Sequence, residues 1–204
     1  MVSLYQAKPA FQNRLRPLVG HLARRGVTPN QVTGGAIALS ALGGLAVAGL
    51  PQSSLPLLAL PGVLLARMAL NAMDGMLARE HKLQTPLGGI LNELGDVVSD
   101  VALYLPFACI PGIASGWVVG VVILAMLTEL AGVLGAAVGQ NRRYEGPMGK
   151  SDRAFVLAAL ALALGLGLTP GLWLTGVWAI LLILEIWTVA NRVSATLGEV
   201  QPCQ

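Results

Sequence analysis

The sequence of residues 71–100, NAMDGMLAREHKLQTPLGGILNELGDVVSD, places carboxylate and amide side chains within and between two strongly apolar stretches. In its first half the notable residues fall at i, i+3, i+4 and i+7, which is one face of a helix: Asn71, Asp74, Gly75 and Ala78. In its second half they advance by four residues and form a stripe on the next helix: Gly88, Asn92, Asp96 and Asp100. Antiparallel packing of these two helices would bring both polar faces together.

The rest of the chain is apolar enough to be a membrane protein. Of its 204 residues, 55% are hydrophobic and 11% are charged, and the mean hydropathy is +0.70. This composition excludes an ordinary soluble domain. Most of the apolar segments approach the ~20 residues that cross a bilayer as a helix. They are 32–50, 55–79, 86–110, 116–138, 152–168 and 172–190, the fifth being the shortest. We therefore predict an all-α membrane protein with six transmembrane helices.

The distribution of basic residues predicts the orientation. The connections near 51–54, 111–115 and 169–171 are short and uncharged, whereas every Lys and Arg except Arg67 lies on the other side of the predicted spans. By the positive-inside rule, both termini and the polar site are expected on the cytoplasmic side of a bacterial inner membrane. Because the basic residues fall between apolar spans, a nucleic-acid partner is not expected.

The N-terminal segment predicts a further helix outside the six spans. Apolar residues recur at helical spacing beside basic ones: Leu15, Leu18, Val19 and Leu22, with Arg14, Arg16 and Arg25. Such a helix lies on the membrane surface or packs against the bundle, and the sequence allows both. The predicted organisation is an interfacial helix over 1–28, a six-helix domain over 29–197 and a short cytoplasmic tail over 198–204.

The polar faces have the composition of a metal and nucleotide site. Carboxylates inside membrane spans are costly and are usually functional or paired. Asp and Asn oxygens suit a hard cation such as Mg²⁺, or Mn²⁺. The glycines leave room for a nucleotide, and Arg79 can offset phosphate charge. A structural polar network is the alternative, but it leaves the interleaved glycines without a reason.

This pattern resembles the signature of the CDP-alcohol phosphotransferases, Asp-x2-Asp-Gly-x2-Ala-Arg-x8-Gly-x3-Asp-x3-Asp. The chain keeps the spacing as Asn71-x2-Asp74-Gly75-x2-Ala78-Arg79-x8-Gly88-x3-Asn92-x3-Asp96, with Asn at the first and third Asp positions. The segment Gly26-Val-Thr-Pro-Asn30-x-Val-Thr33 also resembles the segment that precedes the first span in this family.

The resemblance implies transfer of a phosphatidyl group from CDP-diacylglycerol to the hydroxyl of a small alcohol, with release of CMP. It implies metal ligands at Asn71, Asp74, Asn92 and Asp96. It implies a CDP pocket lined by Asp74, Gly75, Ala78, Arg79 and Gly88. Asp96 would be the catalytic base. Membrane lipids as surroundings and a homodimeric assembly are also implied.

The two asparagines leave the metal positions with two formal negative charges instead of four. We therefore expect one ion to bind tightly, with a second ion weak or supplied only with substrate. Glu93 and Asp100 are auxiliary candidates that could restore the missing charge. Arg67 lies at a depth similar to Asp100, and we predict an ion pair between them, against the alternative of a direct catalytic or metal role for Asp100.

The acceptor is expected to meet the second basic segment, 142–153. The residues favoured for acceptor binding are Arg143, Lys150 and Arg153, which lie around a predicted helix start. Their charge favours a phosphorylated acceptor such as glycerol 3-phosphate over serine, choline or a free polyol, unless they serve only to fix topology. Two other functions stay open: hydrolysis of the CDP-lipid, and a catalytically degenerate nucleotide- or lipid-binding member of the family.

Overall fold

The computed structural model describes residues 4–139 and 141–200, and the regular secondary structure of this part of the chain is helical, with no strand. The helices are α1 (Leu4–Arg24), α2 (Pro29–Gly49), α3 (Ser54–Glu80), α4 (Pro86–Tyr104), the 3-10 turn η1 (Leu105–Cys109), α5 (Ser115–Val138), α6 (Lys150–Gly165) and α7 (Leu172–Val200). An all-α fold is therefore confirmed.

Each predicted apolar segment corresponds to one helix from α2 to α7. Four of them, α2, α3, α5 and α7, are long and apolar enough to cross a membrane. The 16 residues of α6 span ~24 Å at 1.5 Å per residue, less than the ~30 Å of a hydrocarbon core. The membrane character is thus supported, and six crossings remain a prediction. Helix α7 continues to Val200, into the segment predicted as the cytoplasmic tail.

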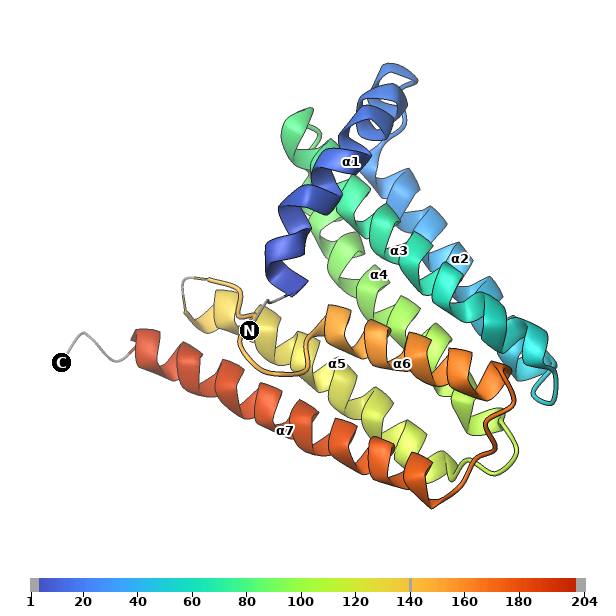
Figure 1. Cartoon of the computed structure of the whole chain (residues 1–204). Helices are drawn as coiled ribbons and strands as arrows, with labels where there is room; N and C mark the ends of the chain where they lie inside the picture. Colours follow the sequence, from blue (N-terminus) through green and yellow to red (C-terminus); the bar gives the residue numbers. More distant parts are fainter. Residues whose placement is uncertain (1–3, 140, 201–204) are drawn as a thin grey trace.

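The connections between helices gather at two ends of the bundle (Figure 1). The α2–α3, α4–α5 and α6–α7 connections lie together at one end. The α3–α4 and α5–α6 connections lie toward the other, where α1 crosses the bundle. Helix α2 packs on α3 and α4, α3 on α6, and α5 on α7. Both polar faces predicted on α3 and α4 therefore point to the end that carries α1.

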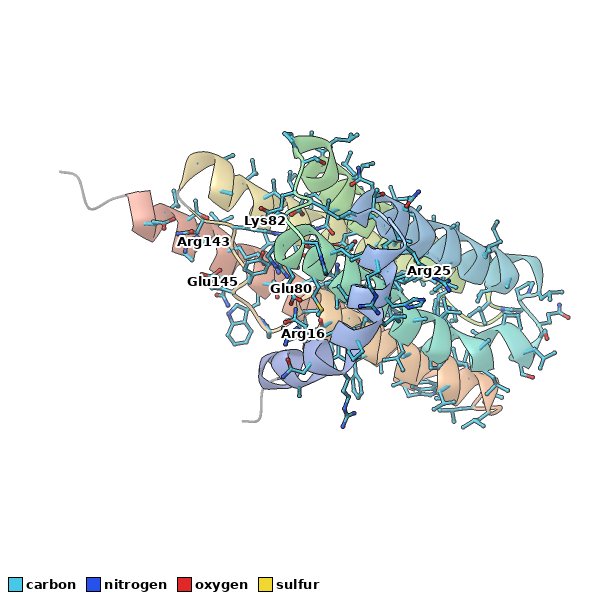
Figure 2. All side chains as sticks on the ribbon, turned by 90° about the horizontal axis from the view of Figure 1, so that it is seen from above. Arg16, Arg25, Glu80, Lys82, Arg143 and Glu145 are labelled. Atoms are coloured by element: carbon cyan, nitrogen blue, oxygen red, sulfur yellow. The ribbon has the colours of Figure 1, made fainter. Side chains whose placement is uncertain are left out.

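Helix α1 packs on the bundle through a small apolar core of its own. Val19 is fully buried against Val32 of α2 and Met73, Met76 and Leu77 of α3. At its exposed side, Arg16 forms an ion pair of 3.0 Å with Glu80 at the end of α3 (Figure 2). The packed arrangement that the sequence allowed is confirmed, and contact with the membrane surface remains a prediction.

Two caps start helices next to the polar faces. Thr28 forms a capping box with Gln31 before Pro29, which occupies the first turn of α2. Thr85 accepts the N–H of Gly88 at 3.0 Å before Pro86 starts α4. These caps satisfy N–H groups that have no partner inside the helix.

Gly44 permits the close crossing of α2 and α4. A Cβ built on Gly44 would lie 1.8 Å from the backbone oxygen of Ala102, so any side chain would force the two helices apart.

We predict that Gly44→Ala lowers the free energy of unfolding by about 1–3 kcal/mol, the usual cost of overpacking. Thermal unfolding of the detergent-solubilised protein measures this change. The matched control is Gly35→Ala, also within α2, where a Cβ meets no atom within 4 Å. It should be neutral or slightly stabilising, because Ala favours helix over Gly. Equal unfolding temperatures for the two variants would contradict the crossing.

Candidate active site

The polar faces of α3 and α4 meet through a direct hydrogen bond. The Asn71 side-chain amide on α3 donates to Oδ1 of Asp96 on α4 at 2.7 Å. Oδ2 of the same carboxylate forms an ion pair with the ammonium of Lys150, the first residue of α6. The predicted convergence of these two faces is confirmed for this pair, and α6 adds a cation that the spacing alone did not place there.

Asp74 provides the unsatisfied oxygen of the site. Its carboxylate is buried, and Oδ2 accepts the hydroxyl hydrogen of Thr33 on α2 at 2.8 Å. Oδ1 has no hydrogen-bond partner within the described residues. A buried carboxylate oxygen without a donor is costly, so this atom fits a bound cation.

The donor set at these positions suits one hard divalent ion. It contains the carboxylates of Asp74 and Asp96 and the amide oxygens of Asn71 and Asn92, all oxygen ligands. Within residues 4–139 and 141–200, no group of three or more His, Cys, Asp or Glu side chains is placed to hold a metal. The two asparagines account for this result, because two of the four positions are not carboxylates.

The residues expected to line the CDP pocket lie at the same end of the bundle. Gly75, Ala78 and Gly88 are partly buried, and Arg79 is exposed. A Cβ on Gly88 would lie 2.9 Å from Oδ1 of Asn30, so the glycine lets α4 start close against α2.

Arg67 joins the core of the bundle to Asp96. Its guanidinium is buried and lies 2.6 Å from Oδ1 of Asp100, which confirms the predicted ion pair. The same nitrogen donates to the backbone oxygen of Asp96 at 3.1 Å and lies 3.8 Å from its Oδ1. Arg67 therefore helps to fix the position of Asp96, whose other carboxylate oxygen contacts Lys150.

Arg153 lies inside the bundle, 1% exposed. Its guanidinium contacts Glu129 at 2.9 Å and Asp100 at 3.2 Å. It also donates to the Thr128 hydroxyl at 2.8 Å and to the Met148 carbonyl at 3.2 Å. These partners hold Arg153 in the core of the bundle, and contact with an acceptor remains a prediction.

The expected auxiliary acids are also paired. Glu93 forms an ion pair with Arg142, which also contacts Glu129 at 2.8 Å. Asp100 is shared by Arg67 and Arg153. Neither acid therefore supplies free negative charge in place of the missing signature carboxylates.

Contacts with α7 also hold the basic segment, residues 142–153, in place. Arg143, half-buried, pairs with Glu199 near the end of α7. Arg192 donates to the carbonyl oxygens of Thr128 and Glu145. The segment is thus held over the site by side chains of α5 and α7.

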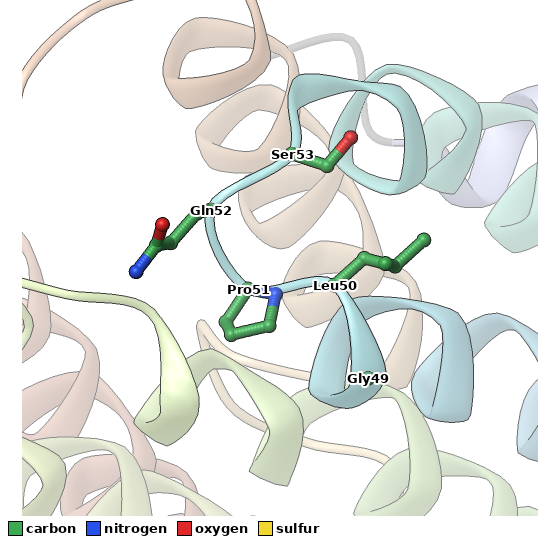
Figure 3. Close-up of a pocket in the computed structure, with 5 residues that line it drawn as sticks. All are labelled: Gly49, Leu50, Pro51, Gln52 and Ser53. Atoms are coloured by element: carbon green, nitrogen blue, oxygen red, sulfur yellow. The ribbon is translucent and has the colours of Figure 1, made fainter.

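Sequence reasoning missed two contributors. Thr33 and Asn30 appeared only as part of the segment before the first span, yet Thr33 bonds Asp74 and Asn30 lies against Gly88. Their signal was the polar side chains just inside a helix start. A pocket at the opposite end, lined by residues 49–53 (Figure 3), contains no charged side chain and lies away from this site.

We predict that Arg67→Gln and Asp100→Asn each destabilise the protein, by about 3 kcal/mol, because each leaves a buried partner charge uncompensated. The double variant should cost less than the sum of the two, as expected for groups that act on each other. Chemical unfolding in micelles measures the three values.

The exposed pair Arg16–Glu80 is the matched control for this cycle, and Arg16→Gln with Glu80→Gln should show no measurable coupling. Simple additivity at Arg67 and Asp100 would show that the pair does not act as a unit.

Comparison with known proteins identifies the family of this chain. The chain is 46% identical over 196 residues to the inner membrane protein YnbA of Escherichia coli K12, covering 96% of this chain and 97% of that one. The fold of this chain resembles that of the phosphatidylinositol phosphate synthase PgsA1 of Mycobacterium tuberculosis. The TM-score is 0.70 for the structure with CDP-DAG bound, at 20% identity, with 91% of this chain and 92% of that chain covered.

For the PgsA1 structure with manganese and citrate the TM-score is 0.76, at 19% identity, with 92% and 91% of the two chains covered. The family description CDP-alcohol phosphatidyltransferase matches residues 26–190, which contain every signature residue. The chain therefore belongs to the CDP-alcohol phosphatidyltransferase family and is a membrane enzyme of that class.

Proposed function

We propose that this enzyme transfers the phosphatidyl group of CDP-diacylglycerol to the hydroxyl of a small phosphorylated alcohol, with glycerol 3-phosphate favoured. The observation that carries this proposal is the contact between Lys150 and Asp96. It places a cation able to bind phosphate next to the carboxylate that the signature assigns as base. A PgsA1 structure of the same fold holds CDP-DAG, which supports the choice of donor.

The metal positions are Asn71, Asp74, Asn92 and Asp96, and the free oxygen of Asp74 supports them. A Mg²⁺ or Mn²⁺ ion bound there would neutralise charge on the pyrophosphate, the main burden in this class of reaction. The manganese of the second PgsA1 structure supports a divalent ion. The CDP moiety is assigned to the glycine-lined surface of Gly75, Ala78 and Gly88, with Arg79 against phosphate.

Asp96 takes the proton of the acceptor hydroxyl in this scheme. The acceptor oxygen then forms a bond to the phosphorus of the phosphatidyl group, and the bond from that phosphorus to the bridging oxygen breaks. CMP leaves with the electron pair of the broken bond. Asn71 and Lys150 orient the Asp96 carboxylate, one on each oxygen.

The phosphate of the acceptor is assigned to Lys150 and Arg143. An ammonium has three N–H donors, so Lys150 can contact Asp96 and a phosphate oxygen together. The N-terminus of α6 adds backbone N–H groups that favour an anion. From the core of the bundle, Arg153 supports the start of α6 through its ion pair with Asp100 and its hydrogen bond to the Met148 carbonyl.

The membrane setting follows the distribution of charge. We propose six membrane crossings, with both termini and the active site on the cytoplasmic side, since the basic segments and the signature lie at one end of the bundle. A homodimer is proposed from the family resemblance.

The test of this function uses the purified protein, labelled CDP-diacylglycerol, Mg²⁺ or Mn²⁺ and a panel of acceptors: glycerol 3-phosphate, inositol phosphate, inositol, serine, glycerol and choline. We expect metal-dependent CMP release and a new phospholipid with a phosphorylated acceptor. CMP release without any acceptor would indicate a hydrolase instead. Binding of CDP-lipid with no CMP under any condition would indicate a degenerate site.

Acceptor binding is tested separately by Lys150→Ala and Arg143→Ala. Each should raise the KM for the acceptor by about tenfold or more, because a charge-assisted bond to phosphate is lost. The KM for CDP-diacylglycerol should change much less. Lys82→Ala and Arg25→Ala, exposed basic residues on the same side, serve as controls. Equal changes in both KM values would remove the acceptor assignment.

A further inference from the structure

Each oxygen of the Asp96 carboxylate contacts a side chain of its own chain. Oδ1 accepts from Asn71, and Oδ2 contacts the Lys150 ammonium. Oδ1 of Asp74, in contrast, is a buried oxygen that finds no donor in the part of the chain that the structure describes. The site therefore has one open carboxylate and one that already holds a cation.

Among the described residues, Asp96 is the one acid that forms an ion pair with Lys150. Asp100 is shared by Arg67 and Arg153, and Glu93 is paired with Arg142. The signature positions contribute the two carboxylates of Asp74 and Asp96. With the Lys150 ammonium counted, they carry one net negative charge, which one divalent ion more than balances.

The position of Lys150 is not explained by the stability of its helix. It is the first residue of α6, where the helix dipole disfavours a positive charge. The helix start is nevertheless well fixed: Gly149 N–H donates to Asp152 at 3.0 Å, and Met148 N–H donates to the Thr188 hydroxyl at 2.9 Å. The backbone from which the Lys150 side chain reaches Asp96 is thus well fixed.

From these observations we infer that Lys150 is a resident cation, which takes the place of a second divalent ion at Asp96. The enzyme binds one divalent ion, centred on Asp74, and the Lys150 ammonium supplies the second positive centre. A second ion on the same carboxylates would meet the ammonium and the first ion in a poorly hydrated site, where repulsion is strong. This inference rests on the proposed function only in taking the signature residues as the metal site.

The inference is tested by counting Mn²⁺ ions on the full chain in phosphatidylcholine nanodiscs, by electron paramagnetic resonance during a Mn²⁺ titration. The wild type should bind one Mn²⁺ per chain, with no coupling between two manganese spins. A second ion should bind only when the missing carboxylates are restored by Asn71→Asp with Asn92→Asp. Adding Lys150→Met to that pair should tighten the second ion by about tenfold or more.

Two further variants separate charge from other effects in the carboxylate-restored background. Lys150→Arg keeps the cation and should leave the second ion weak. Lys82→Met removes an exposed lysine from the α3–α4 connection and should change nothing. Because the wild-type count needs no substitution, the inference stays testable even if a variant does not fold.

Two Mn²⁺ ions of similar affinity on the wild type would overturn the inference, as would a second ion that Lys150→Met does not tighten. One Mn²⁺ bound without CMP release would sink the proposed function and leave the resident cation in place. No Mn²⁺ bound at all would overturn both.

Discussion

The buried guanidinium of Arg153 is the contact on which the arrangement of the bundle depends. A charge in this apolar interior is tolerated only with close partners. Arg153 finds its nearest carboxylates in Asp100 of α4 and Glu129 of α5, and Glu185 of α7 lies 3.9 Å away. Since the buried guanidinium would be left without these partners, α6 cannot slide along α4 or α5 by one turn without a large cost.

Asp100 connects Arg153 to the candidate active site. Arg67 of α3 shares this carboxylate and also holds the backbone oxygen of Asp96. These contacts fix the position of α3 along α4. One helical turn after Arg67, the Asn71 amide donates to the Asp96 carboxylate. The contacts of Arg153 also fix the position of the start of α6. Lys150, the first residue of that helix, therefore reaches the same carboxylate. The buried ion network and the Asp96 carboxylate, the proposed base, are therefore parts of one arrangement.

The sequence predicted the parts of this arrangement that depend on spacing along one helix or on a simple antiparallel pair. The six helical segments, the two polar faces and the Arg67–Asp100 pair follow from periodicity and equal depth. The partners of Arg153 and Glu129 do not, because they depend on how α6 and α5 pack around α4, and residues far apart in sequence carry no shared period. Lys150 and Arg153 looked alike as basic residues near a helix start. One faces the site and the other the core, and only the packing of α6 distinguishes them.

The balance of charge gives the two asparagines a physical role. The network pairs the cations Arg67, Arg142, Arg153 and Arg192 with the acids Glu93, Asp100, Glu129 and Glu185. It therefore has no surplus charge to offer the signature positions. Four carboxylates there would repel one another strongly before any metal bound. With Asn71 and Asn92, the empty site carries only Asp74 and Asp96, and Lys150 offsets one of them. The substrate-free enzyme therefore has less charge repulsion at these positions, but it also attracts a divalent ion less strongly. The negative pyrophosphate of a CDP-lipid would restore that attraction, so that metal and lipid bind most favourably together.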